Sequence, residues 1–245
     1  MKATHAVTAV LIVLALVTTL FGLEKAGRSA RFAGTAHALT DSSLPLKVLA
    51  EPGDVFALWK QQGVRGTIIV HVGRELHFAP VEKDNESAAP SFPIVVTAAA
   101  LKYEPALDAK NFLWLAMRTN MARQVITVLP DDSFREKVSL VREAMQKGYL
   151  GILAMDNRTI VAHELGSKRV IADGYLPAID EPVVLNVDSS IFDSYEPAAL
   201  HAMIGKSGLK IALMTCCLSE SNAAVTDQAR ARLKEFAQLV VSHRK

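Results

Sequence analysis

Residues 182–193 read Pro-Val-Val-Leu-Asn-Val-Asp-Ser-Ser-Ile-Phe-Asp, an apolar run that ends in a cluster of polar residues. The run is long enough for a strand that is buried on both faces of a sheet. Residues 65–71, Arg-Gly-Thr-Ile-Ile-Val-His, show the same pattern and also end in a polar side chain. In an open α/β sheet, ligands and metal ions bind at the carboxyl ends of such strands. The two stretches therefore predict the fold class and the region in which a functional site is expected.

Strand-like and helical patterns alternate along the rest of the chain. Apolar runs predict strands at 46–50, 67–71, 125–129, 183–188 and 209–216, and periodic apolar residues predict helices at 54–62, 108–120, 131–147, 196–204 and 226–241. This alternation is typical of a three-layer α/β domain, a mainly parallel sheet with helices on both faces. We expect residues 68–70, 125–128, 183–187 and 211–214 to be neighbouring parallel strands. Short strands around Asp156 and Asn157 predict a hairpin insertion within residues 149–180.

Composition and length exclude several classes of protein. The chain has 245 residues, a formal net charge of +2 and 6% aromatic residues. This length suits a single domain with a substantial core. The small net charge and the lack of basic runs interleaved with aromatic residues argue against a nucleic-acid partner. The sequence also lacks G-x-G-x-x-G, P-loop and G-x-S-x-G motifs, which argues against dinucleotide binding and against a serine nucleophile elbow.

Residues 6–23 form an uncharged apolar stretch near the N-terminus. At the helical rise of about 1.5 Å per residue, this stretch would be about 27 Å long, enough to cross the core of a bilayer. The alternative is a cleaved signal peptide, for which residues 36–38 offer an A-x-A-like site. The long gap between residue 23 and that site favours an uncleaved transmembrane helix. We therefore predict a membrane anchor or signal segment at 1–23, a tether at 24–44 and a single α/β domain at 45–245.

The side of the membrane on which the domain lies is harder to predict. Three basic residues follow the apolar stretch and one precedes it: Lys25, Arg28 and Arg31, against Lys2. The positive-inside rule would then keep the domain in the cytoplasm, whereas an N-terminal apolar segment more often exports the chain that follows it. The adjacent Cys216 and Cys217 would point to opposite faces of a strand, so they form no disulfide framework that reveals the compartment. We expect a membrane-anchored protein with an extracytoplasmic body, and a cytoplasmic body is the alternative.

Polar side chains collect after four of the predicted strands. Imidazole and carboxylate groups bind divalent metal ions. Asp188 is the strongest single candidate, because a carboxylate that ends so apolar a run is costly unless it meets a metal, a cation or several donors. We expect His71, His77, Asp188 and Glu220 to converge in one cleft at the carboxyl edge of the sheet. The candidate metal ligands are His71, Glu75, His77, Asp188, Asp193 and Glu220.

Each candidate also has an ordinary structural interpretation. His71 can be a hydrogen-bonded strand end and His77 part of a surface hairpin. Asp188 or Asp193 can cap the local turn, and Glu220 can start a helical segment. Asp131, Asp132 and Ser133 read as the N-terminal cap of a helix. Cys216 and Cys217 are expected to pack as small apolar groups.

Taken in order, these segments resemble a remote branch of the arginase/deacetylase-like (ureohydrolase) fold over residues 65–241. Residues 68–71 lead to Glu75 and His77 where the family has an Asp-x-His-x-Asp metal motif, and residues 184–193 lie where it has Asp-x-Asp-x-x-Asp. Further segments that fit the order are 111–113, 125–130 and 213–220. The resemblance implies the three-layer fold and a binuclear metal site that hydrolyses amide or related C–N bonds.

The chain departs from the family at its metal ligands. The first family motif falls on Gly73, Glu75 and His77, and Ser190 replaces the middle Asp of the second. Because two-metal hydrolysis requires about five or six anionic or imidazole ligands, a binuclear site is not expected. We expect a membrane-tethered binding or scaffolding domain with no cofactor and with a protein or small-molecule partner. The alternatives are a hydrolase with one divalent metal ion, held by His71, Glu75 or His77 together with Asp188, and an unrelated Rossmann-like binding protein.

Overall fold

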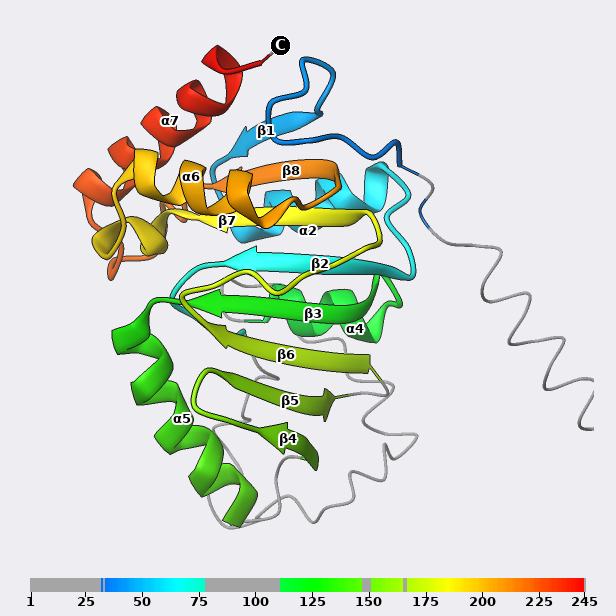
Figure 1. The fold of residues 1–245 in the computed structure, drawn as a ribbon, viewed down its shortest axis with the longest axis vertical. Coiled ribbons are helices and arrows are strands. Elements are labelled where there is room, and N and C mark those ends of the chain that lie inside the picture. The colour runs from blue at the N-terminus through cyan, green and yellow to red at the C-terminus, as the bar shows by residue number, and fades with distance from the viewer. Residues whose placement is uncertain (1–31, 33, 78–110, 147–150, 165–166, 245) are drawn as a thin grey trace, which may run out of the picture.

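The computed structural model describes residues 32, 34–77, 111–146, 151–164 and 167–244. Within these residues the chain forms one sheet of eight strands in the order β1-β8-β7-β2-β3-β6-β5-β4 (Figure 1). The strands are β1 (Leu46–Leu49), β2 (Thr67–Val72), β3 (Ala122–Leu129), β4 (Gly151–Met155), β5 (Thr159–Glu164), β6 (Ser167–Asp173), β7 (Val183–Asp188) and β8 (Ile211–Cys217). The helices are α2 (Pro52–Gln61), α4 (Phe112–Arg118), α5 (Asp131–Gln146), α6 (Pro197–Ser207) and α7 (Asp227–Ser242), and a short 3-10 helix, η1 (Ser189–Asp193), follows β7.

The middle of the sheet is parallel, which confirms the sequence-based prediction. β8, β7, β2 and β3 are consecutive neighbours, and each adjacent pair runs parallel. β1 and β6 extend this parallel set on its two sides. Because parallel strands end at the same edge, residues that follow β2, β7 and β8 are brought to one side of the molecule.

The region between α5 and β7 departs from the parallel pattern, as the sequence predicts. β4 and β5 pair antiparallel, and the Asp156 N–H donates to the Thr159 carbonyl at 2.9 Å at the turn between them. β5 is antiparallel to β6, whereas β6 is parallel to β3. The insertion is therefore the β4–β5 hairpin, and β6 belongs to the main sheet.

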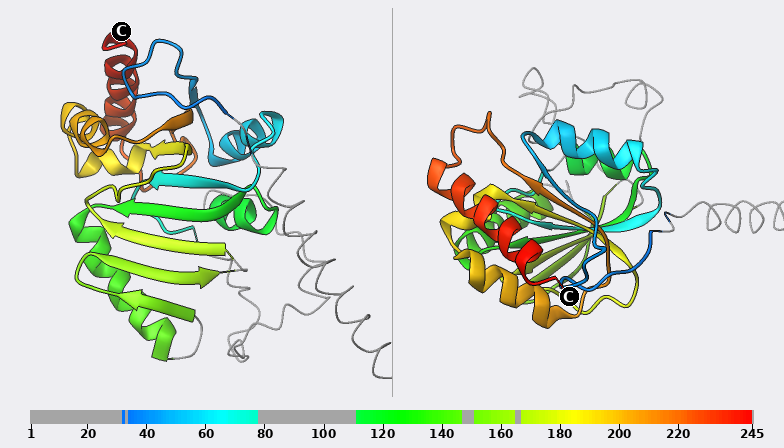
Figure 2. Two further views of the ribbon diagram at one scale, coloured as in Figure 1. Left: turned by 45° about the vertical axis from the view of Figure 1, so that its right-hand side comes forward. Right: turned by 90° about the horizontal axis from the view of Figure 1, so that it is seen from above.

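Helices cover both faces of the sheet, as the view from above shows (Figure 2). On one face α2 and α4 bury Trp59 and Phe112 against Ile69 and its neighbours. On the other face α6 and α7 enclose a second core, in which Phe236 packs with Val70. Ile69 and Val70 are consecutive residues of β2 that point to opposite faces, so this strand is buried on both sides. The chain is therefore a mainly parallel α/β domain with three layers.

Residues 34–44, which we expected to belong to a tether, pack on the domain instead. The His37 N–H donates to the Ile211 carbonyl at 2.9 Å, and the Ile211 N–H donates to the His37 carbonyl at 2.8 Å. Leu39 and Leu44 are buried in the same core as α7. Burying side chains of this size stabilises the folded chain by about 1.5–3 kcal/mol each, which explains why the segment docks. The domain therefore begins before residue 45.

Several sequence-based predictions fall on residues that lie outside those the structure describes. These are the anchor at 6–23, the first part of the tether, and the helix start at Asp108. The anchor therefore stays a prediction. None of the helices in the described part of the chain has the length and apolar character needed to span a bilayer.

Glu51 connects the start of α2 to the loop that follows β8. Its carboxylate accepts hydrogen bonds from the Ser221 N–H at 2.7 Å and from the Ser221 hydroxyl at 2.8 Å. The Glu51 N–H donates to Asp54 Oδ2 at 3.1 Å. Asp54 is therefore the third residue of the helix, and Glu51 is its N-cap. These bonds hold the loop after β8 in place beside the carboxyl edge.

His201 lies between α6 and α7. Its ring centroid is 5.0 Å from that of His243 and 6.5 Å from that of Phe236. Its Nε2 atom is buried without a hydrogen-bond partner in the described part of the chain. Burial, together with the nearby His243, lowers the pKa of His201 below the ordinary histidine value. The packing of these two helices therefore favours the neutral ring.

We predict that acid weakens this helix pair. Because the pKa of His201 is lower in the folded chain, the unfolded chain binds the proton more readily, and stability falls as the pH drops below about 6.5. Replacing His201 with Phe removes this contribution, so the stability gap between variant and wild type should widen toward low pH. Urea unfolding between about pH 8 and about pH 5 measures the gap, with the exposed His163→Phe as control. A gap that does not change with pH would contradict the prediction.

Candidate functional site

A row of polar side chains crosses the sheet face that α2 and α4 cover. His71 of β2 lies opposite Asn186 of β7, and Asn186 lies opposite Thr215 of β8. Thr127 of β3 lies on the other side of His71. All four residues are fully buried. Since water is excluded there, His71, Asn186 and Thr215 depend on each other for hydrogen bonds, whereas Thr127 Oγ1 has no partner among the described residues.

The hydrogen bonds along the row define which nitrogen of His71 carries the proton. Thr215 Oγ1 donates to Asn186 Oδ1 at 2.8 Å, so the amide nitrogen of Asn186 faces His71. Asn186 Nδ2 donates to His71 Nδ1 at 2.9 Å. Nδ1 is thus the acceptor, and the proton of the neutral imidazole lies on Nε2. His71 therefore presents an N–H donor at the carboxyl edge.

His77 accepts a hydrogen bond from this N–H group. The Nε2 atoms of His71 and His77 are 3.2 Å apart, so the His71 N–H donates to His77. The His77 backbone has a φ of 49°, a left-handed conformation that is uncommon for a residue with a side chain. Phe112 packs edge-on against both rings, at 4.7 Å from His77 and 5.7 Å from His71 between centroids. Backbone strain that is held in place by such contacts is characteristic of functional sites.

Asp188 ends β7 beside the two histidines. Its Oδ1 accepts from the Ser190 N–H at 2.9 Å, and its Oδ2 accepts from the Ser219 hydroxyl at 2.6 Å. Burial raises the pKa of Asp188, and the hydrogen bonds from Ser190 and Ser219 offset only part of this effect. Asp188 is the N-cap of η1, which is the structural role that the sequence offered as an alternative to metal binding.

Gly73 lies between His71 and Asp188. A Cβ atom on Gly73 would stand 2.7 Å from His71 Nε2 and 3.2 Å from the Cβ of Asp188. Both side chains therefore approach one backbone position, which only glycine leaves open. Through these contacts His71, His77 and Asp188 form one cluster, which we call the His–Asp cluster.

The other three candidate ligands lie outside the His–Asp cluster. Glu75 is exposed and forms an ion pair with Lys137 at 3.7 Å. Asp193 is exposed and accepts a hydrogen bond from Thr226 Oγ1 at 3.0 Å, at the start of α7. Glu220 is exposed, whereas the members of the cluster are buried. Among the residues that the structure describes, no three His, Cys, Asp or Glu side chains are placed to hold one metal ion.

Arg74 connects the end of β2 to its neighbours. Its guanidinium donates to Asp132 Oδ2 at 2.7 Å and to Ser194 Oγ at 2.6 Å, and its N–H donates to Ser190 Oγ at 3.1 Å. Partial burial acts to raise the pKa of Asp132, but the hydrogen bonds from Ser133 and Arg74 prevail and lower it. Asp132 thus stays ionised at the start of α5, as expected for a helix N-terminus.

The two cysteines are thiols at neutral pH. Cys216 and Cys217 are free and buried, in cores on opposite faces of the sheet. Burial raises the pKa of each thiol to about 12. Cys217 Sγ lies 3.4 Å from Ser219 Oγ, next to Asp188, but it supplies no thiolate there. The expectation that both residues pack as small apolar groups agrees with this environment.

Sequence reasoning missed the residues that hold the cluster together, namely Asn186, Thr215, Ser219 and Arg74. The sequence did contain an indication of two of these residues. Asn186 and Thr215 are polar residues inside buried strands, two positions after Val184 and Leu213, so each shares a face with those core residues. Their partners, however, follow from the strand order and register.

No protein-family model matches the chain, and no curated protein matches it either. The resemblance to the arginase/deacetylase-like fold therefore rests on the sequence motifs alone.

We predict that Gly73→Ala disrupts the His–Asp cluster. The added Cβ would stand 2.7 Å from His71 Nε2, so the ring or the backbone must shift. Overpacking of this kind costs about 1–3 kcal/mol, which urea unfolding would measure. Gly205→Ala is the matched control, because a Cβ there would meet nothing within 4 Å. Equal stabilities of the two variants would show that the close approach at Gly73 is not required.

A second prediction concerns the charge on Asp188. Folding raises the pKa of this carboxyl above its ordinary value of 3.8, so the folded chain binds the proton more tightly than the unfolded chain does. The carboxyl therefore stabilises the fold below about pH 3.8, and this stabilisation is lost as the pH rises through the pKa of the folded state. The amide in Asp188→Asn does not titrate and can keep both hydrogen bonds, since the Ser219 hydroxyl can turn to accept. Wild type should therefore lose stability relative to the variant in urea unfolding as the pH rises above about 4. A constant difference would contradict the assigned shift.

Proposed function

We propose that this chain is a membrane-tethered binding domain of the arginase/deacetylase-like type, without the two-metal hydrolase site, and that it binds a protein or small-molecule partner at the carboxyl edge of its sheet. One observation carries the proposal. The donor atoms that a metal ion would need are already hydrogen-bonded within the chain: both nitrogens of His71 and both oxygens of Asp188.

A metal ion would have to displace these bonds. Hydrogen bonds to charged groups contribute about 1.5–3 kcal/mol and neutral ones about 0.5–1.5 kcal/mol, so the metal-free cluster is stabilised by its own contacts. Ser190, where the family has an aspartate, accepts from the Arg74 N–H instead. Gly73 supplies space where the family has another aspartate. The carboxylates that would balance two divalent ions are thus replaced by groups that join β2 to β7.

The place where the chain enters the domain supports a tethered arrangement. The Phe32 N–H donates to the Arg65 carbonyl at 2.8 Å, just before β2 begins, so the chain reaches the domain at the amino edge of the sheet. The His–Asp cluster lies at the opposite, carboxyl edge. If residues 6–23 anchor the chain, the eight residues from 24 to 31 reach at most about 30 Å. The amino edge would then face the membrane, and the cluster would face the aqueous phase.

A second candidate function is hydrolysis of an amide or related C–N bond with one divalent metal ion. The favouring observation is the 3.2 Å separation of the two histidine Nε2 atoms. Two nitrogens that bind a tetrahedral ion with bonds of about 2.0 Å are roughly 3.3 Å apart. His71 and His77 therefore have the spacing of two ligands, and Asp188 approaches the same backbone position, Gly73, as His71 does. This function would require a single ion of modest affinity.

Metal analysis of the purified full-length protein distinguishes the two functions. For the binding domain we expect well under one equivalent of manganese or zinc after dialysis, and no metal-dependent amide hydrolysis. Asp188→Asn and the exposed Asp193→Asn should then behave like wild type. One equivalent that is lost in Asp188→Asn and kept in Asp193→Asn would instead establish the single-metal site. Two tightly bound equivalents of manganese would contradict both.

A further inference from the structure

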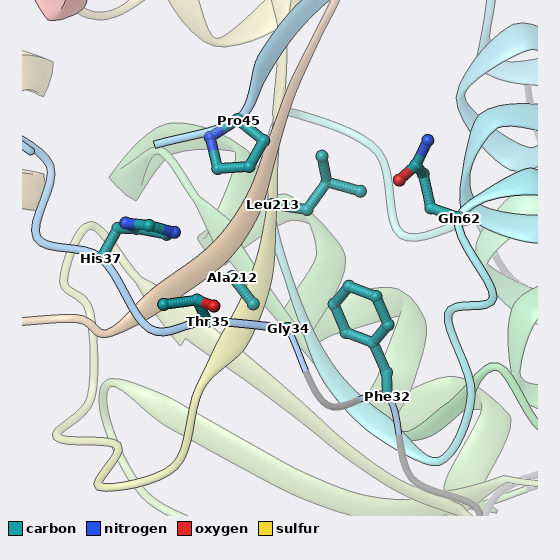
Figure 3. Close-up of a pocket in the computed structure, with 8 residues that line it drawn as sticks. All are labelled: Phe32, Gly34, Thr35, His37, Pro45, Gln62, Ala212 and Leu213. Carbon is teal, nitrogen blue, oxygen red and sulfur yellow. The ribbon is translucent and has the colours of Figure 1, made fainter. Parts of the chain in front are cut away.

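A second site lies at the amino edge of the sheet, away from the His–Asp cluster. An open cavity of about 310 Å³ lies beside the starts of β1 and β8 and the end of α2. The described residues that line it include no Lys, Arg, Asp or Glu: Phe32, Gly34, Thr35, His37, Pro45, Gln62, Ala212 and Leu213 (Figure 3). This volume is at the lower end of the range for small-molecule sites, which are mostly apolar with a few placed polar groups.

His37 is the placed polar group of this cavity. Its Nδ1 lies 3.0 Å from Asp41 Oδ2 and 3.0 Å from Ser43 Oγ. Hydrogen bonds from the Ser43 side chain, from its N–H and from His37 lower the pKa of Asp41 to about 2, so this carboxylate is ionised at neutral pH. An ionised carboxylate accepts, so His37 Nδ1 donates to it, and in the neutral form of the ring Nε2 is the acceptor.

The His37 ring is held firmly and aimed at the cavity. Its backbone forms two hydrogen bonds with Ile211, at 2.9 Å and 2.8 Å. The residue is 8% exposed. Figure 3 shows the far end of the ring directed into the space between Pro45 and Ala212. The hydrogen bonds of the ring to described residues go through Nδ1, and Nε2 is accessible from the cavity.

We infer that this cavity binds a small uncharged aromatic molecule that carries one hydroxyl group, with the hydroxyl donating to His37 Nε2. The ring of such a ligand would lie against Phe32, Pro45 and Leu213, where aromatic and apolar contacts are favourable. The hydroxyl would donate a hydrogen bond to this accessible acceptor, and such a bond contributes modestly to affinity.

The lining also selects against charged ligands. A carboxylate ligand would meet no Lys or Arg in the lining, and Asp41 behind the imidazole would repel it. An ammonium ligand would lose its hydration without gaining a carboxylate in the cavity. An unsubstituted hydrocarbon would fit but would leave His37 Nε2 unpaired. Specificity for a neutral hydroxyl compound therefore follows from one acceptor in an uncharged lining.

The experiment is a titration of full-length protein with three probes of similar size: phenol, toluene and benzoate. Nitrogen-15 NMR of the histidine rings reports on His37 Nε2, and calorimetry gives the affinity. We expect phenol to bind with a Kd on the order of 1 mM and to shift the His37 Nε2 resonance. Toluene and benzoate should bind at least about tenfold more weakly. His37→Gln should reduce phenol affinity toward that of toluene, and His163→Gln, an exposed histidine on β5, should not.

Three results would overturn the inference: no phenol binding at about ten times the expected Kd, toluene binding as tightly as phenol, or benzoate binding more tightly than phenol. If His37→Gln does not fold, the relative affinities of wild type for phenol and toluene still test the inference. Because the cavity and the His–Asp cluster lie at opposite edges, Asp188→Asn should leave phenol binding unchanged. A negative result for phenol binding would therefore not contradict the function proposed for the carboxyl edge.

Discussion

A sheet that is covered by helices on both faces leaves its buried polar side chains no water to bond, and this constraint governs the centre of the molecule. His71, Asn186 and Thr215 lie on neighbouring strands at the same level, and each satisfies the next. Their hydrogen bonds run perpendicular to the strands, so they favour one register of β2, β7 and β8. They also set the tautomer of His71, and through it the direction of the contact with His77.

The carboxyl edge combines strain, burial and close approach in a small volume. His77 is held in a left-handed conformation, and Asp188 is buried at the cost of a raised pKa. Gly73 leaves room for the side chains of His71 and Asp188 to approach the same backbone position. Such costs persist only where the surrounding structure compensates for them, and here Ser190, Ser219 and Phe112 do so. The compensation comes from the chain itself.

The two edges of the sheet use histidine in opposite ways. At the carboxyl edge an amide donates to Nδ1 of His71, so the ring offers an N–H outward. At the amino edge Nδ1 of His37 donates to an ionised carboxylate, so the neutral form of the ring offers a lone pair at Nε2. The partner of the inner nitrogen thus decides whether the outer nitrogen acts as donor or acceptor.

Apolar run length and helical periodicity are local properties, and from them the sequence by itself determined the central strands, most helices, the hairpin and the place where polar groups would gather. It also identified His71, His77 and Asp188 as members of one region. Only the tertiary structure decided which candidates are buried together and which, like Glu75, Asp193 and Glu220, face solvent. The reason is distance along the chain. His71 and Asn186 are 115 residues apart in sequence, and Asp188 and Ser219 are 31 apart, so their pairing depends on strand order and register. No local pattern encodes these two properties, because both arise when the core closes.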